Sequence, residues 1–130
     1  IGGHGILQIS TKTADNDRNP QTNSRIYFEA CDTSYYTSKC CRQLLDHSGD
    51  EFQRGKMDVF EIDDEFYECW GNSKKLHYFM SIGGNDGWLA EKITIQLQSS
   101  TKVCTLNGWL DGNDDNPEGR IILRRPLTCH

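Results

Sequence analysis

Cysteine content constrains this chain more than any other feature of its sequence. Six cysteines occur in 130 residues, and an even number in so short a chain is typical of domains cross-linked by disulfides outside the reducing cytosol. Structural zinc sites usually show paired Cys-x-x-Cys spacings, which this sequence lacks. Cys40 and Cys41 are instead adjacent, which suits two separate bridges better than one metal. We therefore expect a secreted, extracellular protein with three disulfides.

Length and hydropathy are typical of a single domain that spans residues 1–130,. Such a chain can bury a real core, so the disulfides supplement that core and do not replace it. The apolar stretches are far shorter than the roughly 20 residues that a membrane span requires. The chain begins at Ile1 without an initiator Met, which fits removal of a targeting segment and would equally fit a trimmed chain.

Acidic residues are concentrated in two stretches of a chain whose net charge is −5. Residues 46–68 hold nine acids against Arg54 and Lys56, and residues 111–118 hold four more acids. Nucleic acid is not an expected partner, because phosphate binding requires a basic face. A solvated acidic surface is one interpretation of the acids. Calcium is the other, since hard cations take clustered Asp and Asn oxygens.

Strand signals dominate the sequence. β-branched and aromatic residues alternate with polar ones, and Gly, Asn, Asp and Pro occupy the segments between them. The expected strands cover residues 6–13, 25–30, 57–62, 76–82, 93–97, 102–106 and 119–125. Seven or eight such strands predict an all-β fold, an antiparallel sandwich or barrel. Residues 40–46 could instead form a short helix, but a strand followed by a turn fits them better.

Three segments, taken in order, resemble the motifs of the PLAT domain, which is also called the lipoxygenase homology domain. They are Phe52-Gln53-Arg54-Gly55-Lys56-Met57-Asp58-Val59-Phe60, then Asn85-Asp86-Gly87-Trp88-Leu89 leading into a strand, and Lys102-Val103-Cys104-Thr105-Leu106-Asn107-Gly108-Trp109. The resemblance covers most of the chain and implies a β-sandwich of two roughly four-stranded sheets. The sequence departs from the family by its cysteine cluster and by Gln21-Thr22-Asn23-Ser24, which replaces the usual Gly-Thr-Asp.

PLAT domains are accessory modules, and the resemblance implies a function without catalysis. It implies docking to a lipid or membrane surface or to a protein partner, sometimes assisted by calcium. No Gly-x-Ser-x-Gly nucleophile motif occurs, and the four histidines are scattered, so we expect no enzyme activity. The alternative function is a secreted toxin, defence or matrix protein that acts by contact with another extracellular protein.

Candidate site residues follow from the resemblance. It implies a membrane-binding or partner-binding site at Trp88 with Asn85 and Asp86, where an exposed indole could enter a bilayer interface. An equally good interpretation packs Trp88 into the end of the core. Related domains bind calcium between loops at one end of the sandwich, which nominates Asp15, Asp17, Asn23, Asn85 and Asp86 as ligands. Asn and Asp are also ordinary turn residues, so solvated loops remain the simpler alternative.

The resemblance also suggests one disulfide. Cys104 and Cys129 lie on the expected last two strands, which are neighbours in the sandwich of this family, so we expect a bridge between them. The remaining four cysteines leave two pairings open. One joins Cys31 to Cys40 and Cys41 to Cys69, and the other joins Cys31 to Cys41 and Cys40 to Cys69.

Overall fold

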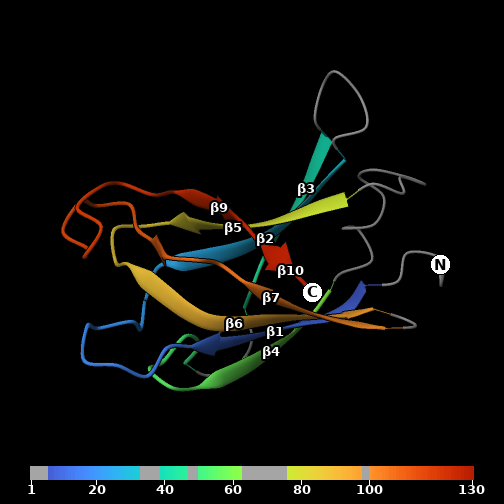
Figure 1. Ribbon diagram of the computed structural model, residues 1–130, viewed down its shortest axis with the longest axis horizontal. Coiled ribbons are helices and arrows are strands. Elements are labelled where there is room, and N and C mark those ends of the chain that lie inside the picture. The colour runs from blue at the N-terminus through green and yellow to red at the C-terminus, as the bar shows by residue number, and fades with distance from the viewer. Residues whose placement is uncertain (1–5, 33–38, 47–49, 63–75, 98–99) are drawn as a thin grey trace.

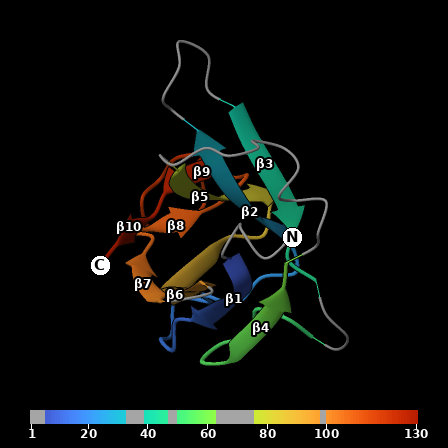
Figure 2. The ribbon, with the colours of Figure 1, turned by 90° about the vertical axis from the view of Figure 1, so that its right-hand side faces the viewer.

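Two antiparallel sheets packed face to face form a β-sandwich in this protein (Figures 1 and 2). The computed structural model describes residues 6–32, 39–46, 50–62, 76–97 and 100–130. The described residues form ten strands and contain no helix, and so none that could cross a membrane. The all-β sandwich predicted from the sequence is therefore confirmed.

The larger sheet, called the large sheet below, has the strand order β10-β7-β6-β1-β4, with β8 paired to the start of β6. Its strands are β1 (Ile6–Thr13), β4 (Met57–Glu61), β6 (Trp88–Leu97), β7 (Thr101–Thr105), β8 (Trp109–Leu110) and β10 (Thr128–Cys129). The other, the small sheet, has the order β3-β2-β5-β9. Its strands are β2 (Arg25–Asp32), β3 (Lys39–Leu44), β5 (Leu76–Gly83) and β9 (Arg124–Pro126).

Alternation along the strands fills the space between the sheets. In β4, Asp58 and Phe60 are buried while Met57 and Val59 are exposed, because successive side chains point to opposite faces of a strand,. The same rule buries apolar residues from both sheets in one core. Its largest fully buried side chains include Ile9, Ile26, Phe28, Phe60, Met80, Trp88, Ile93, Ile95 and Leu110.

The three segments that carry the PLAT resemblance meet in this core. The Phe52 ring stacks on Phe60 with centroids 5.5 Å apart and meets the Trp88 ring edge-on at 5.1 Å. Trp109 is also buried in the same cluster. The turn that precedes β4 is held by Asp58, whose carboxylate accepts a hydrogen bond of 2.9 Å from the Phe52 backbone N–H.

Strand boundaries differ from the sequence-based expectation in three places. Residues 39–44 form strand β3, so the alternative of a short helix is wrong. Strand β6 begins at Trp88, five residues before the expected start. Of the expected strand at 119–125, only Arg124 and Arg125 lie in a strand, β9, because Ile122 pairs with Asp111 in an isolated bridge outside the ladder of the small sheet.

Two disulfides join neighbouring strands at directly paired positions. Cys104 and Cys129 are partners in the β7–β10 register and form the expected bridge. Cys31 and Cys40 are partners in the β2–β3 register and are also bridged, which decides between the two open pairings. Cys41 is disulfide-bonded as well. Its expected partner, Cys69, lies outside the described residues.

Candidate functional site

Three loops gather at one end of the sandwich, on the left in Figure 1. They connect β1 to β2, β5 to β6 and β8 to β9. The loop end, as this region is called below, contains Asn85 and Asp86 from the predicted site. It also contains most of the second acidic stretch of the sequence. The contacts of this region show which of these acids lie close together in the fold.

Asp86 joins the β5–β6 loop to the β1–β2 loop. Its carboxylate accepts a hydrogen bond of 2.7 Å from the Asn23 backbone N–H. Its backbone N–H donates to the Ser24 hydroxyl at 3.0 Å, and its carbonyl accepts from the Thr22 hydroxyl. Asn23, Asn85 and Asp86, all nominated from the sequence, therefore lie together.

The other two nominated ligands face elsewhere. The Asp15 carboxylate forms an ion pair of 3.0 Å with Arg54, next to Gly55. Asp17 is exposed in the β1–β2 loop. Asp15 therefore pairs with an exposed guanidinium and is not brought together with Asn85 and Asp86 in the described contacts. No described contact joins Asp17 to Asp86.

A cavity of about 210 Å³ opens between all three loops. Asn85 and Asp86 line it from one side, and Asp111 and Asp115 of the β8–β9 loop line it from the other. The Asp111 side chain is buried, with the residue only 2% exposed, and its carboxylate accepts hydrogen bonds only from neutral described donors. These are the Asn113 backbone N–H and the Asn116 amide, each at 3.0 Å.

The β8–β9 loop is absent from the ligand set expected from the sequence, and its position is explained by the close approach of two backbones. A Cβ added to Gly112 would lie 2.1 Å from the Gly84 carbonyl oxygen, so only glycine allows this contact,. The Asp-Gly-Asn sequence at 111–113 predicts a turn, but the turn alone does not reveal the contact. The signals in the sequence were the clustered acids of residues 111–118 and the glycine among them.

Glu118 holds the base of the β8–β9 loop. Its carboxylate accepts a hydrogen bond from the Trp109 backbone N–H at 2.9 Å and pairs with the guanidinium groups of Arg125 and Arg120. The Trp109 hydrogen bond is the largest cause that lowers the pKa of Glu118 below its ordinary value; burial opposes it, and Arg125 and Arg120 lower the pKa further. The loop that lines the cavity is thus fixed to the end of the sheet.

Trp88 belongs to the core and not to the surface of the loop end. The residue is 0% exposed, and its indole N–H donates to the Thr13 hydroxyl at 2.9 Å. The expectation of an exposed, membrane-inserting ring at this position is therefore wrong, and the alternative that Trp88 packs in the core is correct. The physical reason is the edge-on contact with Phe52, whose turn covers this end of the sandwich.

A second group of potential ligand atoms lies on the small sheet. Atoms of Glu29, Cys31 and Cys40 approach one another within 4.8 Å. Both sulfur atoms belong to one disulfide, so neither offers a thiolate to a metal. Glu29 is instead paired with Arg124 at 3.1 Å. This group is therefore a structural cluster.

Solved structures of two bacterial toxins contain a region with a similar fold. No protein-family model matches the sequence, and no curated protein matches it either. An alpha toxin from Clostridium absonum matches 95% of this chain with a TM-score of 0.62 and 17% identity, over 32% of the toxin. A Clostridium perfringens alpha toxin isolated from avian strain SWCP matches 98% of this chain with a TM-score of 0.63 and 12% identity, over 33% of the toxin.

The likeness to these toxins concerns the fold alone. Both identities are below one residue in five. The chain spans about a third of the length of each toxin, so the activity of the whole toxins does not carry over to it. The match covers nearly all of this chain and agrees with the β-sandwich described above.

Proposed function

We propose that this chain is a secreted, non-catalytic binding module of the PLAT type that docks on a lipid or membrane surface with the help of calcium. The observation that carries the proposal is the cavity at the loop end. There Asn85 and Asp86 from one loop meet Asp111 and Asp115 from another. Convergence of the three PLAT-like segments around Phe52 and Trp88 supports the family assignment.

Calcium fits the donor set of this cavity. Calcium takes six to eight oxygen ligands from carboxylates, amide or backbone carbonyls and water in flexible geometry. Asp86, Asp111 and Asp115 offer carboxylates, and Asn85 offers an amide oxygen. The buried Asp111 carboxylate, whose described hydrogen bonds come from neutral donors, favours a cation because an uncompensated charge away from water is costly,. Arg18 also lines the cavity, and calcium would have to bind beside its guanidinium. A bound ion would supply the largest positive charge at the loop end.

Membrane docking follows from that charge. The acids of the loop end repel anionic headgroups in the absence of a cation. Calcium would neutralise these acids and attract headgroup phosphates. Secretion is part of the proposal, and the two described disulfides support it because they persist in an oxidising compartment,. The proposal also includes the absence of catalytic activity, which is supported by the lack of a Gly-x-Ser-x-Gly nucleophile motif in the sequence,.

Calorimetric titration with calcium tests the proposed site. We expect a dissociation constant of roughly 0.1–1 mM, as in extracellular modules. Asp86→Asn and Asp115→Asn should each weaken binding. Asp114→Asn is the matched control, because Asp114 is an exposed acid of the same loop that does not line the cavity. Equal calcium affinity in all three variants would overturn the site.

Co-sedimentation with phospholipid vesicles tests the docking. We expect the wild-type protein to pellet with vesicles in calcium and to lose part of that binding when a chelator is added. A protein that pellets with no vesicle of any composition, with or without calcium, is not a membrane module. In that case the alternative of contact with an extracellular protein would replace the proposal.

A further inference from the structure

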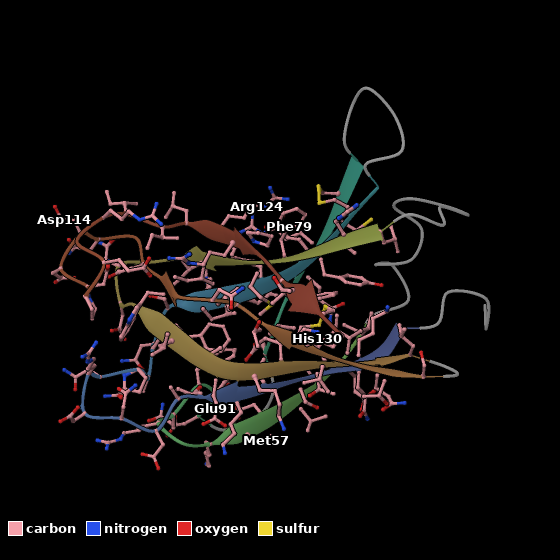
Figure 3. All side chains as sticks on the ribbon, viewed as in Figure 1. Met57, Phe79, Glu91, Asp114, Arg124 and His130 are labelled. Atoms are coloured by element: carbon pink, nitrogen blue, oxygen red, sulfur yellow. A yellow bond between two sulfur atoms is a disulfide. The ribbon has the colours of Figure 1, made fainter. Side chains whose placement is uncertain are left out.

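The outer face of the small sheet is the side that points away from the core (top in Figure 3). Its members follow from strand alternation and register, since residues such as Ile26 and Phe28 are buried,. They are Arg25, Tyr27, Glu29, Cys31, Cys40, Arg42, Leu44, His77, Phe79, Ser81, Gly83, Arg124 and Pro126. Three arginines and two aromatic rings thus share one face.

This outer face is basic, although the chain as a whole has a net charge of −5. Among the strand residues of this face whose side chains the structure describes, Glu29 is the one acid, and it pairs with Arg124 at 3.1 Å. Arg25 and Arg42 are both exposed, and neither has a carboxylate partner among the described residues. Two uncompensated guanidinium groups therefore face solvent on this side of the protein.

Aromatic rings hold two of the arginines against the sheet. The guanidinium carbon of Arg42 lies 3.5 Å from the centroid of the Tyr27 ring. That of Arg124 lies 3.8 Å from the centroid of Phe79, and Figure 3 shows these two side chains together. Stacking of this kind limits the rotamers of a long side chain before any ligand binds. Less conformational entropy is then lost on binding.

Among the described residues, two of the three guanidinium groups are free to meet a ligand. Arg124 starts on β9, but its guanidinium reaches Glu29 and lies 3.2 Å from Cys31 Sγ and 3.7 Å from Cys40 Sγ, so it is already engaged over the middle of the sheet. Arg25 and Arg42 remain, and the exposed apolar side chain of Leu44 lies on the same face. Basic groups beside an exposed apolar side chain suit a membrane, because a membrane presents anionic headgroups above an apolar interior. A sulfated glycan or an acidic peptide offers the charge without the apolar layer.

We infer that the outer face of the small sheet docks on membranes containing anionic phospholipid, independently of calcium. The inference rests on the proposed membrane function and adds a second contact surface to the loop end. Arg25 and Arg42 bind headgroup phosphates, because basic groups near an anionic leaflet are attracted to it. Leu44, 40% exposed beside Tyr27 on the same face, contributes apolar contact,.

Vesicle co-sedimentation in the presence of a chelator isolates this surface from the calcium site. We expect the wild-type protein to bind vesicles of phosphatidylcholine mixed with phosphatidylserine, and to bind pure phosphatidylcholine much more weakly. The double variant Arg25→Gln/Arg42→Gln should bind the mixed vesicles about 25-fold more weakly, roughly fivefold for each arginine. Raising the salt concentration should weaken wild-type binding in the same direction.

A matched variant shows whether vesicle binding depends on the outer face or only on the total charge of the protein. Lys56→Gln/Lys92→Gln removes the same charge from the large-sheet side and should change binding less than twofold. Thermal melting confirms that each variant is folded. Wild-type affinity in Arg25→Gln/Arg42→Gln would overturn the inference, and so would equal loss in the lysine control.

Three further outcomes distinguish a failure of the outer-face inference from a failure of the proposed membrane function. Binding that occurs only in calcium and disappears in Asp86→Asn would overturn the outer-face contact and leave the proposed function standing. Absence of binding to every vesicle, with or without calcium, would overturn both. Binding to a sulfated glycan or to polyglutamate in place of vesicles would show that the occupant of this face is not a lipid.

Discussion

Trp88 donates its indole N–H to the Thr13 hydroxyl at 2.9 Å, and both side chains are completely buried. Thr13 ends β1 and Trp88 begins β6, so this hydrogen bond closes the core where the strands of the large sheet meet the loop end. The buried indole ring of Trp88 therefore packs beneath the loop end and does not reach the surface.

Replacing Trp88 by Ala should destabilise the protein by about 3–5 kcal/mol, because a large cavity remains in the core. Thr13→Val should cost about 1–3 kcal/mol, since it leaves a buried indole N–H without an acceptor. Urea denaturation measures both values. An unfolding free energy within error of the wild type for Trp88→Ala would show that the ring is not part of the core.

The pair Arg124–Glu29 should contribute modestly to stability. Their charged atoms are 3.1 Å apart, and the side chains are 43% and 11% exposed. We expect a coupling energy of about 1 kcal/mol from a double-mutant cycle of Arg124→Gln and Glu29→Gln, because solvent screens the exposed guanidinium. The single change Arg124→Gln should cost more than Glu29→Gln, since it leaves a buried carboxylate unpaired. Additive effects of the two changes would contradict the pairing.

Glu118 should make stability depend on pH in the acidic range. Its pKa is lowered from the ordinary value of 4.5, chiefly by the Trp109 backbone N–H and further by Arg125 and Arg120. A carboxylate with a lowered folded-state pKa stabilises the fold above that ordinary value, and the contribution is lost as pH falls through the lowered pKa. Glu118→Gln should be less stable than the wild type near neutral pH.

The difference between Glu118→Gln and the wild type should shrink as pH falls below 4.5, because the wild-type carboxylate becomes neutral as well. Urea midpoints measured across this pH range check the prediction. Asp114→Asn is the control, since it removes an exposed acid from the same loop. A constant difference across the whole pH range would contradict the assigned role of Glu118.

The two described disulfides should differ in their contribution. The Cys104–Cys129 bridge spans 25 residues and the Cys31–Cys40 bridge spans 9. Loop-closure entropy in the unfolded chain predicts contributions of roughly 3.5 and 2.6 kcal/mol. We expect Cys104→Ala/Cys129→Ala to lower the unfolding free energy by more than Cys31→Ala/Cys40→Ala. The opposite order in denaturant titrations would indicate that native packing, and not chain entropy, sets their effect.

Local patterns in the sequence determined the fold class and several of its details. Alternation in residues 25–30 places Ile26 and Phe28 in the core, because each side chain of a strand points opposite to the next,. The strand signals also lie at the observed positions of β1, β4 and β7, within one or two residues. The Cys104–Cys129 bridge was predicted because the resemblance implies that the strands of these two cysteines are neighbours, and the structure confirms it.

Tertiary structure alone decided the composition of the site. Trp88 follows a polar turn, and its burial depends on Phe52, which lies 36 positions earlier in the chain. Asp15 and Asp111 are both loop acids by composition, yet one faces Arg54 and the other a cavity beside Asp86. Loop residues have no periodicity that fixes their direction. Their surroundings are set by distant segments, and those contacts exist only once the two sheets have packed.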